Sequence, residues 1–147
     1  AEVISLAYNL LHCIDLHRIM GDVMVQGTGV LVHSVLAHGL LADSWTKETS
    51  FEEGDHRRER WLRPEFERKI DHLDAVRFLA HGHVSTLRGA AVRYALANHV
   101  VSTAILGPKS TQQLDALVRE TGGGPTYLPD KDLAALPRAL SRLGIPT

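Results

Sequence analysis

The sequence has few residues of the kinds that cross-link a chain or bind a metal. Cys13 is its single cysteine, so the chain alone can form neither a disulfide nor a thiolate cluster, and we expect Cys13 to be a small core residue. Nine histidines are present. However, His12 and His17 do not have the four-residue spacing that places two ligands on one helix face. His81 and His83 flank a glycine in an expected turn. No metal site is predicted.

Long apolar runs and an excess of either charge are also absent. No stretch reaches the roughly 18 apolar residues that a membrane span needs, and the apolar opening of the chain lacks the basic leader of a signal peptide. Sixteen basic and seventeen acidic residues give a net charge of -1, too little to attract polyanions or anionic membranes. We therefore expect no nucleic-acid or membrane partner, and a cytoplasmic location. The first residue is not Met and the opening resembles an interior strand, so we expect the chain to begin within a domain.

The remaining composition is that of one soluble globular domain, with 44% hydrophobic and 22% charged residues in 147. Strands are expected at 2–9, 30–36 and 100–106, and helices at 12–26, 64–82, 85–99, 110–120 and 130–143. Alternating strands and helices predict a parallel sheet with right-handed crossovers. Because a barrel closes with about eight strands, three strands predict only part of an α/β fold. The polar and aromatic stretch 37–63 is long for a connection and is a candidate functional loop.

The residues after the third strand have the properties of a phosphate site. Gly107 turns the chain and Ser110 can cap the next helix, so that backbone N–H groups and the positive end of the helix dipole face an anion. Lys109 adds a full charge, and Gln113 would face the same ligand. The alternative is an ordinary helix start with a solvated lysine.

The residues after the second strand offer a further set of ligand contacts. Ser34 places a donor at the carboxyl end of a strand, where α/β proteins bind ligands, and Gly39 permits a close approach to its backbone. The alternative is a serine at the edge of a barrel with Leu36 as an ordinary core residue.

Three segments, in order, resemble the last three strands of one enzyme family, the aldo/keto reductases. The sequence Tyr-Asn-Leu-Leu at 8–11 is similar to the end of its sixth strand. Residues 29–41 resemble its seventh strand and the Ser-x-Leu-x-x-Gly-Leu-Leu segment that follows, and in one bacterial branch a loop with Phe and Asp-His-Arg comes next, as at 51–57. Residues 102–114 resemble its eighth strand and phosphate turn.

The resemblance implies that residues 1–147 form the C-terminal part of an aldo/keto reductase domain, a partial (β/α)8 TIM barrel of three parallel strands with flanking helices. The complete form would reduce aldehydes or ketones by hydride transfer from NADPH. Lys109 and Ser110 would hold the 2′-phosphate of NADP, and Ser34 and Leu36 would contact its pyrophosphate and ribose. The cofactor-binding residues that the motifs and the resemblance together predict are Ser34, Leu36, Gly39, Gly107, Lys109, Ser110 and Gln113. His56 or Arg57 could also approach the cofactor, or could lie on a solvated loop face.

The sequence also departs from the family pattern. Ser5 stands in place of a Gln that binds the nicotinamide amide, His33 corresponds to the stacking aromatic, and Ala116 and Leu117 replace an acidic residue and an Asn that clasp adenine. The catalytic Asp, Tyr, Lys and His belong to earlier strands, so we predict no catalytic residue here. Whether the chain is an enzyme depends on what else the protein contains. The alternative is a non-catalytic nucleotide-binding or structural interaction module. Bare strand edges would favour self-association or a complementing chain.

Overall fold

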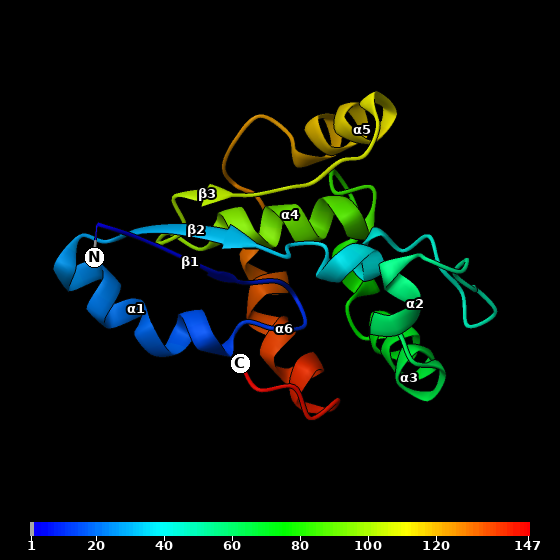
Figure 1. Ribbon diagram of the computed structural model, residues 1–147. Coiled ribbons are helices and arrows are strands. Elements are labelled where there is room, and N and C mark those ends of the chain that lie inside the picture. The colour runs from blue at the N-terminus through cyan, green and yellow to red at the C-terminus, as the bar shows by residue number, and fades with distance from the viewer. Residues whose placement is uncertain (1) are drawn as a thin grey trace.

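The computed structural model describes residues 2–147 and contains a three-stranded parallel sheet (Figure 1). The strands are β1 (Val3–Ala7), β2 (Gly29–His33) and β3 (Thr103–Ala104), and they lie in the order β1-β2-β3. β1 and β2 pair along their whole lengths, whereas β3 pairs only with the centre of β2. Within the described residues the sheet is not closed. The predicted α/β class, with three parallel strands and flanking helices, is confirmed.

Helices follow each strand along the chain. They are α1 (Ile14–Gln26), the 3-10 helix η1 (Ala37–Ala42), α2 (His56–Arg60), α3 (Arg63–Asp74), the 3-10 helix η2 (Arg77–Leu79), α4 (Leu87–Ala97), α5 (Thr111–Thr121) and α6 (Asp130–Ser141). Figure 1 shows α4 running alongside β2 and β3, with α1 on the β1 side of the sheet and α5 beyond β3. None of these helices, in the part of the chain that the structure describes, is long and apolar enough to span a membrane.

The two faces of the sheet differ because alternate side chains of a strand point to opposite faces. On the face that the helices cover, Val30 and Val32 of β2 are fully buried. On the other face, His33 is exposed and Val3 of β1 is 54% exposed. The core therefore lies between the sheet and its helices. Cys13 is buried in it at 1% exposure, as the sequence predicts.

Several predicted boundaries are wrong. β2 stops at His33 rather than at residue 36, because Ser34 adopts a positive φ of 54° that ends the strand. β3 is limited to Thr103–Ala104, since only that part of 100–106 pairs with β2. The helix expected over 64–82 divides into α3 and η2. The helix expected from Ser85 begins at Leu87, because Thr86 provides the N-cap by accepting a hydrogen bond from the Gly89 N–H.

Candidate functional site

A pocket of about 660 Å³ lies beside the residues that follow β2 and β3. Six of the seven cofactor-binding residues predicted from the sequence line it, namely Ser34, Leu36, Gly39, Gly107, Lys109 and Gln113. Ser110 is not among the lining residues, but it is the N-cap of α5 beside Lys109. The structure therefore brings two separate sequence motifs to one cavity. A smaller pocket of about 220 Å³, lined from α1, α4 and α6, contains none of these residues.

The turn before α5 is held by two reciprocal hydrogen bonds. Ser110 Oγ accepts from the backbone N–H of Gln113 at 3.2 Å, and Gln113 Oε1 accepts from the backbone N–H of Lys109 at 2.8 Å. The first N–H groups of an α-helix have no acceptor within the helix, which leaves those of Thr111 and Gln112 free to bind an anion. Across residues 2–147, no side chain forms an ion pair with the Lys109 ammonium. The turn can therefore offer one full positive charge and backbone donors to a phosphate.

The turn after β2 is positioned from the neighbouring strand. Asn9, which is 4% exposed at the end of β1, donates from Nδ2 to the carbonyl of Ser34 at 2.9 Å and accepts from the N–H of Leu11 at 3.0 Å. The Ser34 hydroxyl lies 3.0 Å from Nδ1 of His33. We interpret Asn9 from the sequence only as the residue that ends a strand. Its position directly after an apolar run, where a buried amide needs partners, is the signal that could have identified it.

Gly39 allows a close approach, but the group that approaches is an indole. Gly39 has a φ of +99°, and a Cβ built there would lie 2.8 Å from Cη2 of Trp45. Trp45 also packs against Phe51, Trp61 and Phe66, with ring centroids 5.1, 6.5 and 6.1 Å away. We call these four side chains the aromatic cluster. It ties the long loop after β2 to the main core, to which Phe66 belongs, and one of its members, Trp45, lines the pocket.

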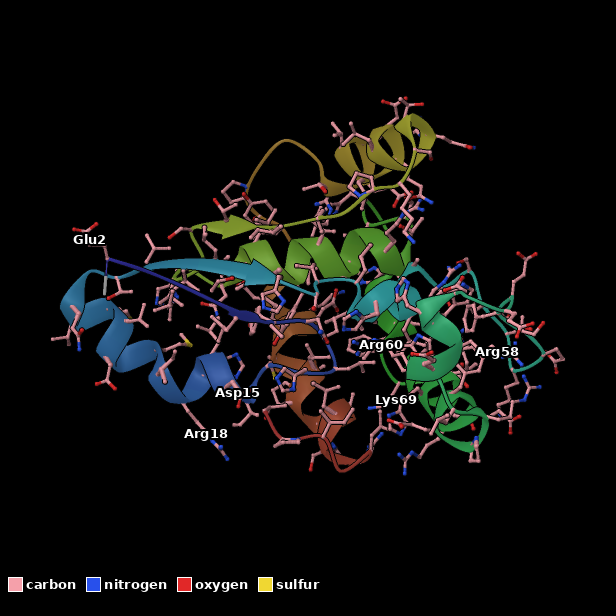
Figure 2. All side chains as sticks on the ribbon, in the orientation of Figure 1. Glu2, Asp15, Arg18, Arg58, Arg60 and Lys69 are labelled. Carbon is pink, nitrogen blue, oxygen red and sulfur yellow. The ribbon has the colours of Figure 1, made fainter. Side chains whose placement is uncertain are left out.

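Arg57 is fixed against this cluster. Its guanidinium lies over the rings of Phe51 and Trp45, 5.0 and 5.8 Å from their centroids, and its Nε donates to both carboxylate oxygens of Asp55 at 2.9 Å. The hydrogen bonds from Arg57 hold the pKa of Asp55 well below its ordinary value. Both Arg57 and His56 line the pocket. In contrast, Arg58 and Arg60 of the same helix, which are labelled in Figure 2, are exposed and are not among the residues that line the pocket.

Arg88 of α4 also lines the pocket, although the sequence alone does not single it out. Arg88 Nε donates to Oε2 of Glu120, near the end of α5, at 2.8 Å, and Thr86 Oγ1 donates to the same oxygen at 2.8 Å. The hydrogen bond from Arg88 lowers the pKa of Glu120. Arg88 sits on a helix with no motif, so only its tertiary contact reveals its position.

The pocket lining is basic although the chain as a whole is close to neutral. The cationic and imidazole side chains that line it are His33, His38, His56, Arg57, Arg88 and Lys109. Among the lining residues in the described chain there is no Asp or Glu. Such a surface favours an anionic ligand. No group of three or more His, Cys, Asp or Glu side chains in residues 2–147 could hold a metal ion.

The structure also shows which of the residues that depart from the family pattern line the pocket. Ser5 is exposed on β1 and does not line the pocket, whereas His33 does. Leu117 lines the pocket and is 5% exposed, and its neighbour Ala116 is 9% exposed.

Comparisons with known proteins agree on one family. The family model described as the aldo/keto reductase family matches residues 3–134. A solved structure of the glycerol dehydrogenase AKR11B4 from Gluconobacter oxydans has a TM-score of 0.79 and 25% identity, covering 95% of this chain and 42% of that one. Two structures of the aldo-keto reductase AKR11C1 from Bacillus halodurans share the fold. The apo form has a TM-score of 0.65 at 22% identity, covering 94% of this chain and 43% of that one.

For the holo form the TM-score is 0.60 at 22% identity, with 96% of this chain and 42% of that chain covered. The chain thus spans less than half the length of these solved structures. A search of curated proteins found no match.

Proposed function

Since the chain belongs to the aldo/keto reductase family, we propose that it is the NADP(H)-binding C-terminal portion of an enzyme whose complete form reduces aldehydes or ketones by hydride transfer. The observation that carries the proposal is the basic pocket lined by six of the seven predicted cofactor contacts. A dinucleotide with three phosphate groups matches this lining in charge, and when bound it would supply the hydride. The substrate would be a small carbonyl compound, bound only in the complete enzyme.

The free ammonium of Lys109 and the N-terminus of α5 fit a phosphate monoester. We assign the 2′-phosphate to Lys109 and Ser110, with Gly107 leaving the turn open and Gln113 bracing it. A phosphate bound there would complete donors that the protein itself leaves without an acceptor. A site of this kind would favour NADPH over NADH, which lacks the 2′-phosphate.

The pyrophosphate then belongs beside the turn after β2. Ser34, Leu36 and Gly39 line the pocket, as does Arg57 of α2. Because Asp55 and two aromatic rings already hold the Arg57 guanidinium, little side-chain entropy would be lost when it binds a phosphate oxygen. Arg57 is therefore a further proposed cofactor contact.

Neither of the two buried tyrosines of the described chain, Tyr8 and Tyr94, lines the pocket of the proposed cofactor site. Tyr8 lines the smaller pocket instead, with its hydroxyl 3.2 Å from Nε2 of His17 and accepting from Asn98 at 3.1 Å. Burial raises the pKa of both Tyr8 and Tyr94 above the ordinary phenol value, which makes each a poorer acid. We therefore assign no catalytic residue to this chain and place the proton-transfer groups elsewhere in a complete domain.

A titration that follows nicotinamide fluorescence tests the cofactor assignment. We expect the chain to bind NADPH weakly and NADH more weakly still. Lys109→Ala should reduce NADPH affinity roughly 10- to 100-fold, because a hydrogen bond to a charged group contributes about 1.5–3 kcal/mol. Lys131→Ala, which removes an exposed lysine from α6 outside the pocket, is the control. Equal affinity of the unaltered chain for the two nucleotides would refute the assignment.

The strand edges support a second proposal. In the described chain β1 and β3 each pair with β2 alone, and Val3 and Ile105 are 54% and 47% exposed. Unpaired edges with apolar neighbours favour association. We propose that the chain self-associates or binds a complementing chain. Its proposed location is the cytoplasm. The alternative function, a non-catalytic nucleotide-binding or structural interaction module, would rest on these edges where the chain acts as an interaction module. Sedimentation showing a stable monomer at all concentrations would contradict self-association.

A further inference from the structure

One end of the large pocket lies between α4 and α5, which pack against each other. Leu117 lines it one helical turn after Gln113, about 6 Å further along α5. Arg88 enters the same pocket from α4. This end therefore combines an apolar side chain with a cation, whereas the phosphate turn at Lys109 offers a cation and backbone donors.

The Arg88 guanidinium is held in one orientation. Glu120 takes two of its donors, Nε at 2.8 Å and Nη2 at 2.5 Å, on one edge of the planar group. Glu120 follows Leu117 by three residues and so lies on the same side of α5. The carboxylate is itself fixed by Thr86. The guanidinium is consequently held beside α5, and both it and Leu117 line the pocket before any ligand arrives.

The chemistry of the nucleotide determines what would reach this end. In NADP the 2′-phosphate and the base are attached to the same ribose, so a phosphate at Lys109 and Ser110 leaves the base within one sugar ring of the turn. Leu117 and Arg88 line the same pocket as Lys109. An apolar side chain and a guanidinium plane are both suited to the face of an aromatic base.

The edge of the base would find little to bind. The exocyclic amino group of adenine is a donor, and the pocket lining within residues 2–147 has no carboxylate to accept from it. The amide oxygen of Gln113 already accepts from the N–H of Lys109 at 2.8 Å. We propose that this chain holds the base by its face, through Arg88 and Leu117, and does not recognise the amino group. The proposal rests on the proposed NADP(H) binding and names Arg88 as a residue that determines base specificity.

The test compares NADPH with the reduced nicotinamide hypoxanthine dinucleotide phosphate, which has an oxo group in place of the amino group. Both are fluorescent, so one titration of the full chain serves for both. We expect the two dissociation constants to agree within about twofold. Arg88→Met keeps an unbranched apolar stem as far as the position of Nε and removes the guanidinium, and it should weaken both ligands about five- to tenfold. Arg119→Met, an exposed arginine of α5 outside the pocket, should change neither.

A second variant separates stacking from a merely structural role. Glu120→Gln removes the carboxylate charge but keeps an amide oxygen that can accept from the guanidinium and hold its orientation, so affinity should stay within about twofold of the unaltered chain. If Glu120→Gln weakens binding as much as Arg88→Met, the contact is structural and the proposal is wrong. Hypoxanthine binding more than fivefold weaker than adenine would show a recognised edge and would also overturn it. Failure of the unaltered chain to bind NADPH would instead refute the proposed function, and this assignment with it.

Discussion

The substitution Gly39→Ala isolates the contact between the turn after β2 and the loop that borders the pocket. Gly39 has a φ of +99°, and the added methyl group would lie 2.8 and 2.9 Å from Cη2 and Cζ2 of Trp45. Trp45 cannot move freely, because Phe51, Trp61 and Phe66 surround it. The substitution should therefore lower the free energy of unfolding for two reasons. Alanine is strained at this positive φ, and its methyl group clashes with the indole ring of Trp45.

The two costs can be estimated separately. A left-handed backbone at a residue with a Cβ costs roughly 1–2 kcal/mol, and forcing an extra methyl group into a packed site costs roughly 1–3 kcal/mol. Their sum predicts a loss of about 2–5 kcal/mol in the free energy of unfolding. Gly54 provides the matched control, since its φ is +85° and nothing lies within 4 Å of a Cβ built on it. Gly54→Ala should lose only the backbone part, about 1–2 kcal/mol.

The assay is urea unfolding followed by far-ultraviolet circular dichroism, with both variants and the unaltered chain at the same concentration. Gly39→Ala should be less stable than Gly54→Ala by about 1–3 kcal/mol. It should also weaken NADPH binding, because a displaced Trp45 no longer supports Arg57. Equal stability of the two variants would refute the reasoning, since it would mean that the Trp45 ring moves away from the added methyl group without lowering the free energy of unfolding.

Two further predictions concern groups away from the pocket surface. Asn9→Ala should lower the free energy of unfolding by about 2–4 kcal/mol in the same urea assay, because the Ser34 carbonyl and the Leu11 N–H both lose their partner; a loss below about 1 kcal/mol would contradict this bridging role. The pKa of Glu120 is below its ordinary value in the folded chain. The ionised carboxylate therefore contributes to the free energy of unfolding above the unfolded pKa near 4.3, and this contribution is lost as the pH falls through the lower folded pKa. Glu120→Gln should accordingly be less stable than the unaltered chain at pH 7, and the difference should shrink as the pH is lowered below about 4; a pH-independent difference in urea midpoint would count against the ion pair.

The sequence predicts the parts of this structure that depend on local patterns. Alternating apolar strands and helices are read correctly as a parallel sheet, and Ser110 is correctly predicted as the N-cap of α5. Strand ends are harder, because β2 ends where Ser34 takes an uncommon backbone conformation rather than where apolar residues stop.

The candidate site could be predicted only in part, since half of it is created by long-range contacts. Ser34 and Lys109 lie after adjacent strands of a parallel sheet, so their meeting in one pocket follows from topology. Arg88 has no such signal, because its position depends on Glu120 more than thirty residues later. The seven cofactor-binding residues stay predictions as contacts to NADP until a nucleotide is titrated.

The aromatic cluster gives the molecule a built-in optical probe. The chain has two tryptophans, Trp45 and Trp61, and both belong to this cluster beside the pocket rather than to the sheet. Intrinsic tryptophan emission will therefore report the state of one loop. A change in that emission signals movement or solvation of the pocket wall, even when the strands behind it are undisturbed.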